Sequence, residues 1–125
     1  MTLSLYDSLL QEKIPVENLA SRNNITIYGC GVTVYDDCHI GHGRVFLVYD
    51  TLIRALRQSG YTVESARNIT DIDDKIIARA KQLSISCQEL TQRYSRSMHD
   101  DITRLNCLDV SKEPKATSHI KQMIE

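Results

Sequence analysis

The chain has 125 residues, of which 42% are hydrophobic and 25% are charged, as in ordinary globular proteins. This length suits one small domain with a core of its own. The net charge of -1 supplies no overall basic field for nucleic acid, and no apolar run approaches the ~20 residues of a membrane span. The N-terminus lacks the basic start of a signal peptide, so we expect a cytoplasmic protein with no membrane partner.

Two strands and an intervening helix are predicted in the first half of the chain. Residues 25–30 are rich in β-branched and aromatic side chains, and residues 61–67 alternate as strands do. Residues 42–59 predict a helix that ends at Gly60. Together they predict a right-handed βαβ unit with parallel strands, and residues 3–7 are a weaker candidate strand. The apolar residues at helical spacing are Val45, Val48, Tyr49, Leu52, Ile53 and Leu56.

The second half of the chain is predicted to be mainly helical. Thr70 and Asp73 have the spacing of a capping box, and Ser86 and Glu89 repeat it before a helix over residues 87–105. Residues 106–110 predict a turn, and Pro114 suits the start of a last helix. Because that helix reaches the last residue without a stop signal, we expect a fragment of a longer protein. The apolar residues of the 87–105 helix, typical of a core face, are Leu90, Tyr94, Met98, Ile102 and Leu105.

The four cysteines do not form a recognisable disulfide or zinc module. Cys30, Cys38, Cys87 and Cys107 are separated by 8, 49 and 20 positions, which fits neither a CxxC pair nor a paired zinc knuckle. Without a secretory signal, free thiols or a single metal-ligand cysteine are the better interpretation.

Chemistry-bearing residues concentrate where the first strand meets the helix. His39 and His42 are three apart, so both imidazoles can face one ligand on the first helical turn. A helix start favours anions, and Gly41 and Gly43 would let a base or phosphate approach the backbone. Two imidazoles that donate to a phosphate would stabilise charge developing at phosphorus. A His-x-x-His pair is nevertheless often non-catalytic, and a metal site that joins both histidines to Cys30 and Cys38 is a further alternative.

Two blocks of sequence resemble one family. Residues 28–44 (YGCGVTVYDDCHIGHGR) and residues 67–75 (RNITDIDDK) resemble the signatures of cysteinyl-tRNA synthetases, which are class I aminoacyl-tRNA synthetases. The resemblance continues along the whole chain, including residues 113–117 (EPKAT). It implies a Rossmann-like parallel sheet, of which residues 1–125 would be an N-terminal, incomplete half of the catalytic domain, with helical segments from about residue 72.

The resemblance also implies roles for individual residues. His39 and His42 would be the catalytic histidines that contact ATP, and Gly41 and Gly43 would lie against the adenosine. Cys30 would be a zinc ligand, which fits the preference of zinc for thiolates and would let the metal select a cysteine substrate. A buried, inert thiol is the plain alternative for Cys30. The pocket for the substrate cysteine would be made by Cys30, Gly31, Thr33, Asn68 and Thr70.

Several polar residues have a plainer interpretation beside the functional one. Thr33, Asn68 and Thr70 could each be a cap or turn residue. Asp71, Asp73 and Asp74 could bind magnesium, but carboxylates that interact with a helix dipole are the better interpretation. His99 and His119 are expected to be solvated, and the scattered basic residues map no tRNA surface.

The implied reaction is the ATP-dependent activation of L-cysteine to cysteinyl-adenylate, followed by transfer to tRNA(Cys). ATP with Mg²⁺ and a zinc ion would be required, and the other zinc ligands and a second signature would lie outside this chain. We therefore expect little activity from the 125 residues alone. Two alternatives are a mycothiol-type cysteine ligase, which forms the same adenylate, and a non-catalytic synthetase-like module that binds a nucleotide or a partner.

Overall fold

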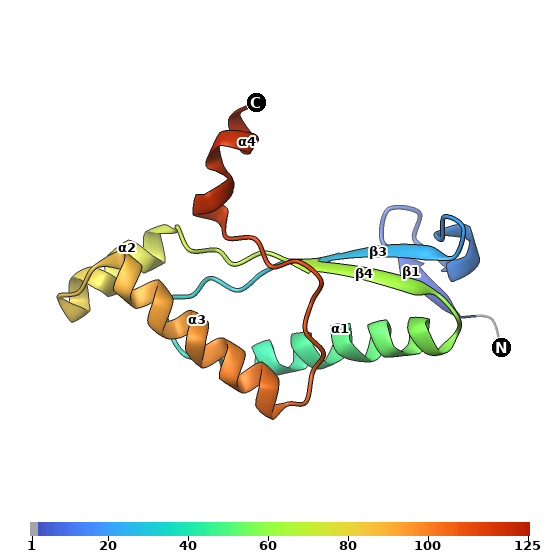
Figure 1. Cartoon of the computed structure of the whole chain (residues 1–125), viewed down its shortest axis with the longest axis horizontal. Helices are drawn as coiled ribbons and strands as arrows, with labels where there is room; N and C mark the ends of the chain where they lie inside the picture. The colour runs from blue at the N-terminus through green and yellow to red at the C-terminus, as the bar shows by residue number, and fades with distance from the viewer. Residues whose placement is uncertain (1–2) are drawn as a thin grey trace.

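A computed structural model describes residues 3–125, and its centre is a small parallel sheet (Figure 1). Strands β3 (Asn24–Gly29) and β4 (Thr62–Arg67) pair in parallel, with Asn24 opposite Thr62 and Gly29 opposite Arg67. Helix α1 (Ile40–Gln58) connects them and covers one face of the sheet. The predicted βαβ unit and the α/β content are thereby confirmed. The other elements are β1 (Ser4–Asp7), β2 (Glu12–Pro15), η1 (Val16–Asn18), α2 (Asp74–Leu83), α3 (Cys87–Arg104), η2 (Ala116–His119) and α4 (Ile120–Ile124).

A third extended segment, residues 111–116, lies beside β4 and widens the sheet. The Arg67 N–H donates to the carbonyl of Lys112, and the Ile69 N–H donates to that of Pro114. The expectation that Pro114 starts a helix is therefore wrong, because Pro114 lies in an extended segment that pairs in parallel with the chain at β4. Proline is tolerated there because its carbonyl accepts a hydrogen bond and the pairing does not require an N–H from its ring. The helical turn begins two residues later, at Ala116.

Helix α1 buries only part of the apolar face that its spacing suggests. Ile53 and Leu56 of that face are buried, together with Phe46 and Asp50, whereas Val45 and Val48 are exposed. Asp50 is accommodated because it accepts the Leu108 N–H and the Arg54 side chain, so its charge is paired. The helix ends as predicted, with Gly60 in the left-handed region at φ 90°.

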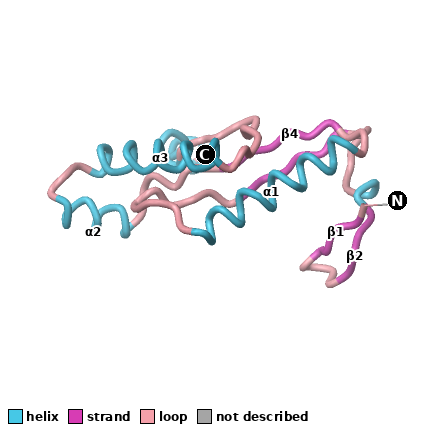
Figure 2. The backbone as a smooth tube through the Cα atoms, turned by 90° about the horizontal axis from the view of Figure 1, so that it is seen from below, coloured by secondary structure: helices cyan, strands magenta, loops and turns pink. Residues whose placement is uncertain are grey.

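Helices α2 and α3 form an antiparallel pair, here called the helical hairpin, at the carboxyl ends of the strands (Figures 1 and 2). The Ser86 side chain caps α3 by accepting the Glu89 N–H, as expected from the sequence. The predicted cap at Thr70 is wrong, since Asp73 caps α2 by accepting the Lys75 N–H. Thr70 is instead held in an extended segment that continues β4.

The buried side chains form two clusters at opposite ends of the sheet. The carboxyl-end cluster joins the helical hairpin to the start of α1, and the amino-end cluster joins the end of α1 to the strands. The β1–β2 hairpin projects beyond the amino-end cluster (Figure 2). Within residues 3–125, no helix is both long and apolar enough to cross a membrane. The carboxyl-end cluster comprises Val34, Phe46, Ile69, Ile76, Ala80, Leu90, Tyr94, Met98 and Ile102; the amino-end cluster comprises Val16, Ile53, Leu56 and Val63.

Candidate functional site

The candidate site is formed by the β3–α1 loop, residues 30–39, and by the segment that follows β4. Both leave the carboxyl ends of parallel strands, which is where open α/β sheets bind ligands. Two parallel contacts connect them, because the Thr70 N–H donates to Val32 and the Val34 N–H donates to Thr70. Thr33 and Thr70, expected to share a pocket, are directly opposite each other in this pairing.

Asn68 fixes the first turn of the loop. Its Oδ1 accepts the Gly31 N–H at 2.8 Å and the Tyr28 hydroxyl at 3.0 Å, and its Nδ2 donates to Thr70 Oγ1 at 3.0 Å. A Cβ at Gly31 would overlap the Asn68 carbonyl, so only glycine fits this approach. Four of the five expected pocket residues are thus brought together by one amide side chain and one backbone pairing. Cys30, the fifth, lies beside them with an exposed side chain.

His39 and His42 cap α1 reciprocally, and we call them the histidine cap. His39 Nδ1 accepts the Gly41 N–H at 3.0 Å, and His42 Nδ1 accepts the His39 N–H at 3.1 Å. The rings stack with their centroids 4.0 Å apart. The amides of His42 and Gly43 donate to the His39 carbonyl. The sequence suggested that first-turn amides would be available to an anion, and these two are not.

The cap also determines which imidazole nitrogens can meet a ligand. An imidazole whose Nδ1 accepts a hydrogen bond carries its proton on Nε2 when it is neutral. Burial lowers the pKa of His42, and the neighbouring His39 lowers it further. Both changes favour the neutral ring that the cap requires. The site therefore presents two Nε2–H donors that point away from the helix backbone.

The two glycines of the cap have different surroundings. A Cβ at Gly41 would come within 2.8 Å of His39 Cε1, so Gly41 makes room for the capping ring. A Cβ at Gly43 would meet only Leu105 Cδ1, at an ordinary 3.6 Å. Protein packing therefore explains glycine at position 41, whereas packing among the described residues does not require glycine at position 43.

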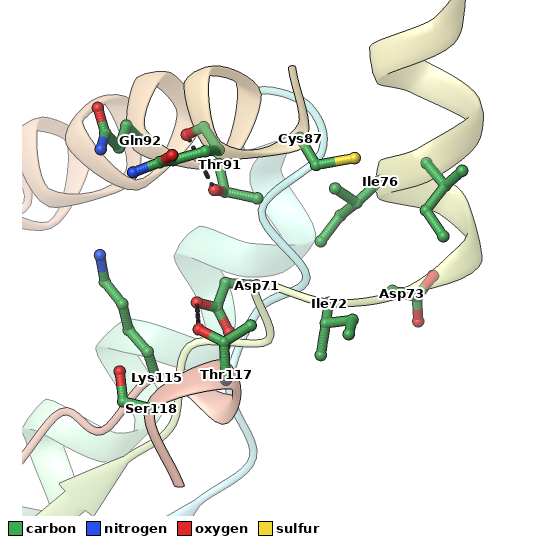
Figure 3. A pocket seen from close by; sticks show the side chains of 12 residues that line it. Asp71, Ile72, Asp73, Ile76, Cys87, Thr91, Gln92, Lys115, Thr117 and Ser118 are labelled. Atoms are coloured by element: carbon green, nitrogen blue, oxygen red, sulfur yellow. Dashed lines mark hydrogen bonds between the residues drawn. The ribbon is translucent and has the colours of Figure 1, made fainter. Parts of the chain in front are cut away.

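The acidic residues after β4 are engaged in structural contacts. The Asp71 carboxylate accepts both the backbone N–H and the hydroxyl of Thr117 (Figure 3), and Asp73 caps α2. Asp71 and Asp73 border a hollow of about 570 Å³ that is also lined by Ile72, Ile76 and Lys115 (Figure 3). The structure thus favours the helix-start and anchoring interpretation of these carboxylates over magnesium binding.

The exposed Cys30 thiol has no metal-ligating partners in the part of the chain that the structure describes. Residues 3–125 contain no group of three or more His, Cys, Asp or Glu side chains that could hold a metal ion. Cys38 packs against the carboxyl-end cluster, and burial raises its pKa, with the carboxylates of Asp101 and Asp37 adding to the effect. The four-residue metal cluster considered from the sequence is therefore not formed.

Comparisons with known proteins agree with this geometry. Residues 16–125 match the family described as "tRNA synthetases class I (C) catalytic domain". The chain belongs to this family. The resemblance seen in the two sequence blocks is thereby confirmed.

Curated relatives of this class I synthetase domain are named cysteine–tRNA ligase. The ligase of Dichelobacter nodosus is 52% identical over 122 residues, that of Legionella pneumophila 48% over 122, and that of Shewanella pealeana 47% over 126. Each comparison covers 98% of this chain but only 26% or 27% of the relative. The chain therefore spans about a quarter of the length of these relatives.

One polar network of this synthetase domain joins residues that no sequence motif connects. Glu113, on the extended segment beside β4, accepts hydrogen bonds from Arg67 and pairs with His99 of α3. The Arg67 guanidinium also lies over the Phe46 ring, 5.1 Å from its centroid. His99 is exposed, as expected, but its pairing with Glu113 is additional to that expectation. Its partner is 14 positions away and Arg67 lies 46 positions from Glu113, so no local pattern reveals the network.

Proposed function

We propose that this chain supplies the nucleotide-binding part, and some of the amino-acid pocket, of a cysteine–tRNA ligase. The proposed reaction is ATP-dependent activation of L-cysteine to cysteinyl-adenylate, followed by transfer to tRNA(Cys). The observation that carries the proposal is the histidine cap, whose two Nε2–H donors stand at the carboxyl end of β3 in a chain of this family.

The cap matches the chemistry of the activation step. A carboxylate oxygen of cysteine bonds to the α-phosphorus of ATP while the bond to the pyrophosphate oxygen breaks, and charge is spread over the non-bridging oxygens. The Nε2–H groups of His39 and His42 would donate to those oxygens, already oriented by their Nδ1 bonds. The absence of a side chain at Gly43 would let the nucleoside approach the backbone of α1.

The loop bracketed by Asn68 is the proposed pocket for the amino acid. Gly31, Thr33 and Thr70 lie together at the mouth of the sheet, with Cys30 exposed beside them. Cys30 would supply one thiolate to a zinc ion whose other ligands come from outside these 125 residues. Zinc bound there would select a cysteine thiolate over a serine hydroxyl.

The remaining assignments extend the same proposal. The parallel sheet of β3, β4 and residues 111–116 would be the first half of a Rossmann-like sheet, and residues 1–125 an N-terminal part of the catalytic domain. Mg²⁺ would accompany ATP, and tRNA(Cys) would bind mainly through parts of the ligase outside this chain. We place such an enzyme in the cytoplasm.

Substitutions that preserve the cap but remove the imidazoles test this proposal. Asn is a good N-cap residue, and Gln suits the third helical position of a capping box, so His39→Asn and His42→Gln should keep α1 intact. In a protein of the relatives' length that contains these residues, each should lower kcat of cysteine-dependent ATP–pyrophosphate exchange by about 10²–10³-fold. Exchange at the parental rate in either folded variant would overturn the role of that histidine.

The acceptor and the competence of the isolated chain are measured in the same assay. The longer protein should charge tRNA(Cys) and leave an amino-sugar acceptor unmodified; the reverse result would assign it to the mycothiol-type ligases. The 125-residue chain alone should show little exchange, since it holds one candidate zinc ligand. Robust exchange from this chain would contradict that expectation.

A further inference from the structure

The segment that precedes the histidine cap is bonded to side chains of the helical hairpin. Asp36 and Asp37, here called the acidic pair, stand three and two residues before His39, respectively. Arg79 Nη2, on α2, lies 3.2 Å from Asp36 Oδ2. The Ser97 hydroxyl, on α3, donates to Asp37 Oδ1 at 2.7 Å. Each residue of the pair is thus fastened to a different helix of the hairpin.

These contacts are poorly explained by stability alone. The Arg79 side chain is 33% exposed and that of Asp36 48%, and ion pairs this exposed contribute little to folding free energy. Arg79 Nη1 donates to Gln82 Oε1 at 3.5 Å, but the buried Nε has no hydrogen-bond partner among residues 3–125, which is an unfavourable arrangement. The Arg79–Asp36 contact therefore adds little to the free energy of folding and leaves a polar atom unsatisfied. A role in positioning the β3–α1 loop would explain why the contact is made.

The chain between the acidic pair and the cap has little freedom to absorb movement. Cys38 packs against the carboxyl-end cluster, and His39 follows it with extended backbone angles before its ring turns onto α1. A shift of the acidic pair would therefore move the His39 ring. Through the reciprocal cap it would also move His42, because the rings are stacked and His42 Nδ1 accepts the His39 N–H.

We propose that Arg79 and Ser97 are positioning residues for the histidine cap. They fix the acidic pair to the helical hairpin, so that the place of the hairpin determines where the two Nε2–H donors stand. The proposal rests on the proposed function for its meaning in catalysis, since the donors matter only if a phosphate meets them. The positioning itself is a property of the chain without a ligand.

Nuclear magnetic resonance on the nucleotide-free 125-residue chain tests the positioning. In Ser97→Ala, amide exchange at His39 and Gly41, whose N–H groups are bonded in the cap, should rise about tenfold, as expected for the loss of one charge-assisted hydrogen bond. Arg79→Gln should give a smaller rise of about threefold, because its ion pair is more exposed. The Nε2 signals of both imidazoles should shift in each variant, which a loss of global stability alone would not cause.

Conservative and neighbouring substitutions are the controls. Ser97→Thr keeps the hydroxyl and Arg79→Lys keeps the charge, so both should restore the parental imidazole signals. Arg96→Gln changes an exposed residue of α3, the helix that carries Ser97, and should leave the imidazole signals unchanged. If Arg79→Gln does not fold, Ser97→Ala and Ser97→Thr still decide. Parental exchange and imidazole signals in folded Ser97→Ala would overturn the proposal.

A titration with ATP separates this inference from the proposed function. In the parental chain, ATP should shift the Nε2 signals of the cap, and in Ser97→Ala the midpoint should move to about threefold higher concentration or more, because fewer molecules hold the donors in place. Signals that do not respond to ATP in the parental chain would count against the proposed function. The exchange measurements would still decide the positioning role.

Discussion

The inner and outer sides of helix α1 are covered very differently. At the carboxyl ends of the strands, its inner side packs with the helical hairpin and the β3–α1 loop around a cluster that includes Leu90, with 0% of its surface exposed; this region is here called the enclosed end. The outer flank of α1 exposes apolar side chains, among them Ile40 at 91% and Val48 at 58%, around a hollow of about 580 Å³. Among the described residues, β3 likewise pairs with a strand on one side only.

This contrast shows which interactions the 125 residues supply by themselves. The site loop has side-chain partners within the described chain, namely Asn68, Arg79 and Ser97. The flank of α1 carries the apolar surface of a helix that is covered on more than one side. The predictions below challenge this difference, beginning with the largest expected effect.

The enclosed end should be far more sensitive to truncation than the outer flank. Leu90→Ala removes a fully buried side chain and should lower the free energy of unfolding by about 3 kcal/mol. Val48→Ala removes an exposed one and should change it by less than about 0.5 kcal/mol. Urea unfolding measures both. Equal losses would mean that the flank of α1 is covered in solution.

Two glycines extend the comparison to the backbone. Gly31→Ala would press a methyl group into the Asn68 carbonyl and should cost about 2 kcal/mol. Gly43→Ala places the same methyl group in ordinary van der Waals contact with Leu105 within α1 and should be neutral, or stabilising by up to about 1 kcal/mol. Thermal unfolding separates them. A tolerated Gly31→Ala would show that the loop can move away from Asn68.

Local signals were sufficient to predict the elements that build the site. The strands and α1 were placed within two residues of their observed ends, because strand alternation, helical spacing and Gly60 are properties of neighbouring residues. Ser86 was likewise recognised as a cap. The histidine pair was located at the helix start, although its reciprocal capping was not foreseen.

The errors arose where a distant partner overrides a local preference. Pro114 has the local signal of a helix start, but its segment pairs with the chain at β4. Thr70 has the local signal of a helix cap, but its backbone N–H and carbonyl bond to the β3–α1 loop. Val48 has the spacing of a buried residue, but nothing in the described chain covers it. Arg79 and Ser97 were missed because their partners lie 43 and 60 positions away on another element.

The Glu113 network adds a pH-dependent component to the enclosed end. Burial alone would raise the pKa of Glu113, but hydrogen bonds from Arg67 and His99 outweigh it and lower the pKa. Stability from this carboxylate is therefore complete above the ordinary pKa of 4.5 and is lost as pH falls through the lowered value. Glu113→Gln should cost about 1.5 kcal/mol at pH 7 and flatten the acid limb in urea titrations. An unchanged acid limb in Glu113→Gln would show that the network does not stabilise the fold.

The histidine cap should give the smallest effect, in a different pH window. The pKa of His42 is lowered below its ordinary value of 6.5, first by burial and then by His39, and the cap needs the neutral ring. Its contribution is thus complete above pH 6.5 and is lost as pH falls through the lowered pKa. His42→Ala should cost about 1 kcal/mol or less at pH 8.

His42→Gln is the matched control for this last effect, because its side-chain oxygen can accept the His39 N–H at any pH. It should retain most of the stability at pH 8 and lose part of the decline below pH 6.5. The difference between the two curves reports the loss of the His42 imidazole together with its contact with the stacked His39 ring. Superimposable stability curves of the parental chain and His42→Gln would mean that protonation of His42 leaves the cap intact. The stability of the start of α1 would then come from packing against the helical hairpin rather than from the two imidazoles.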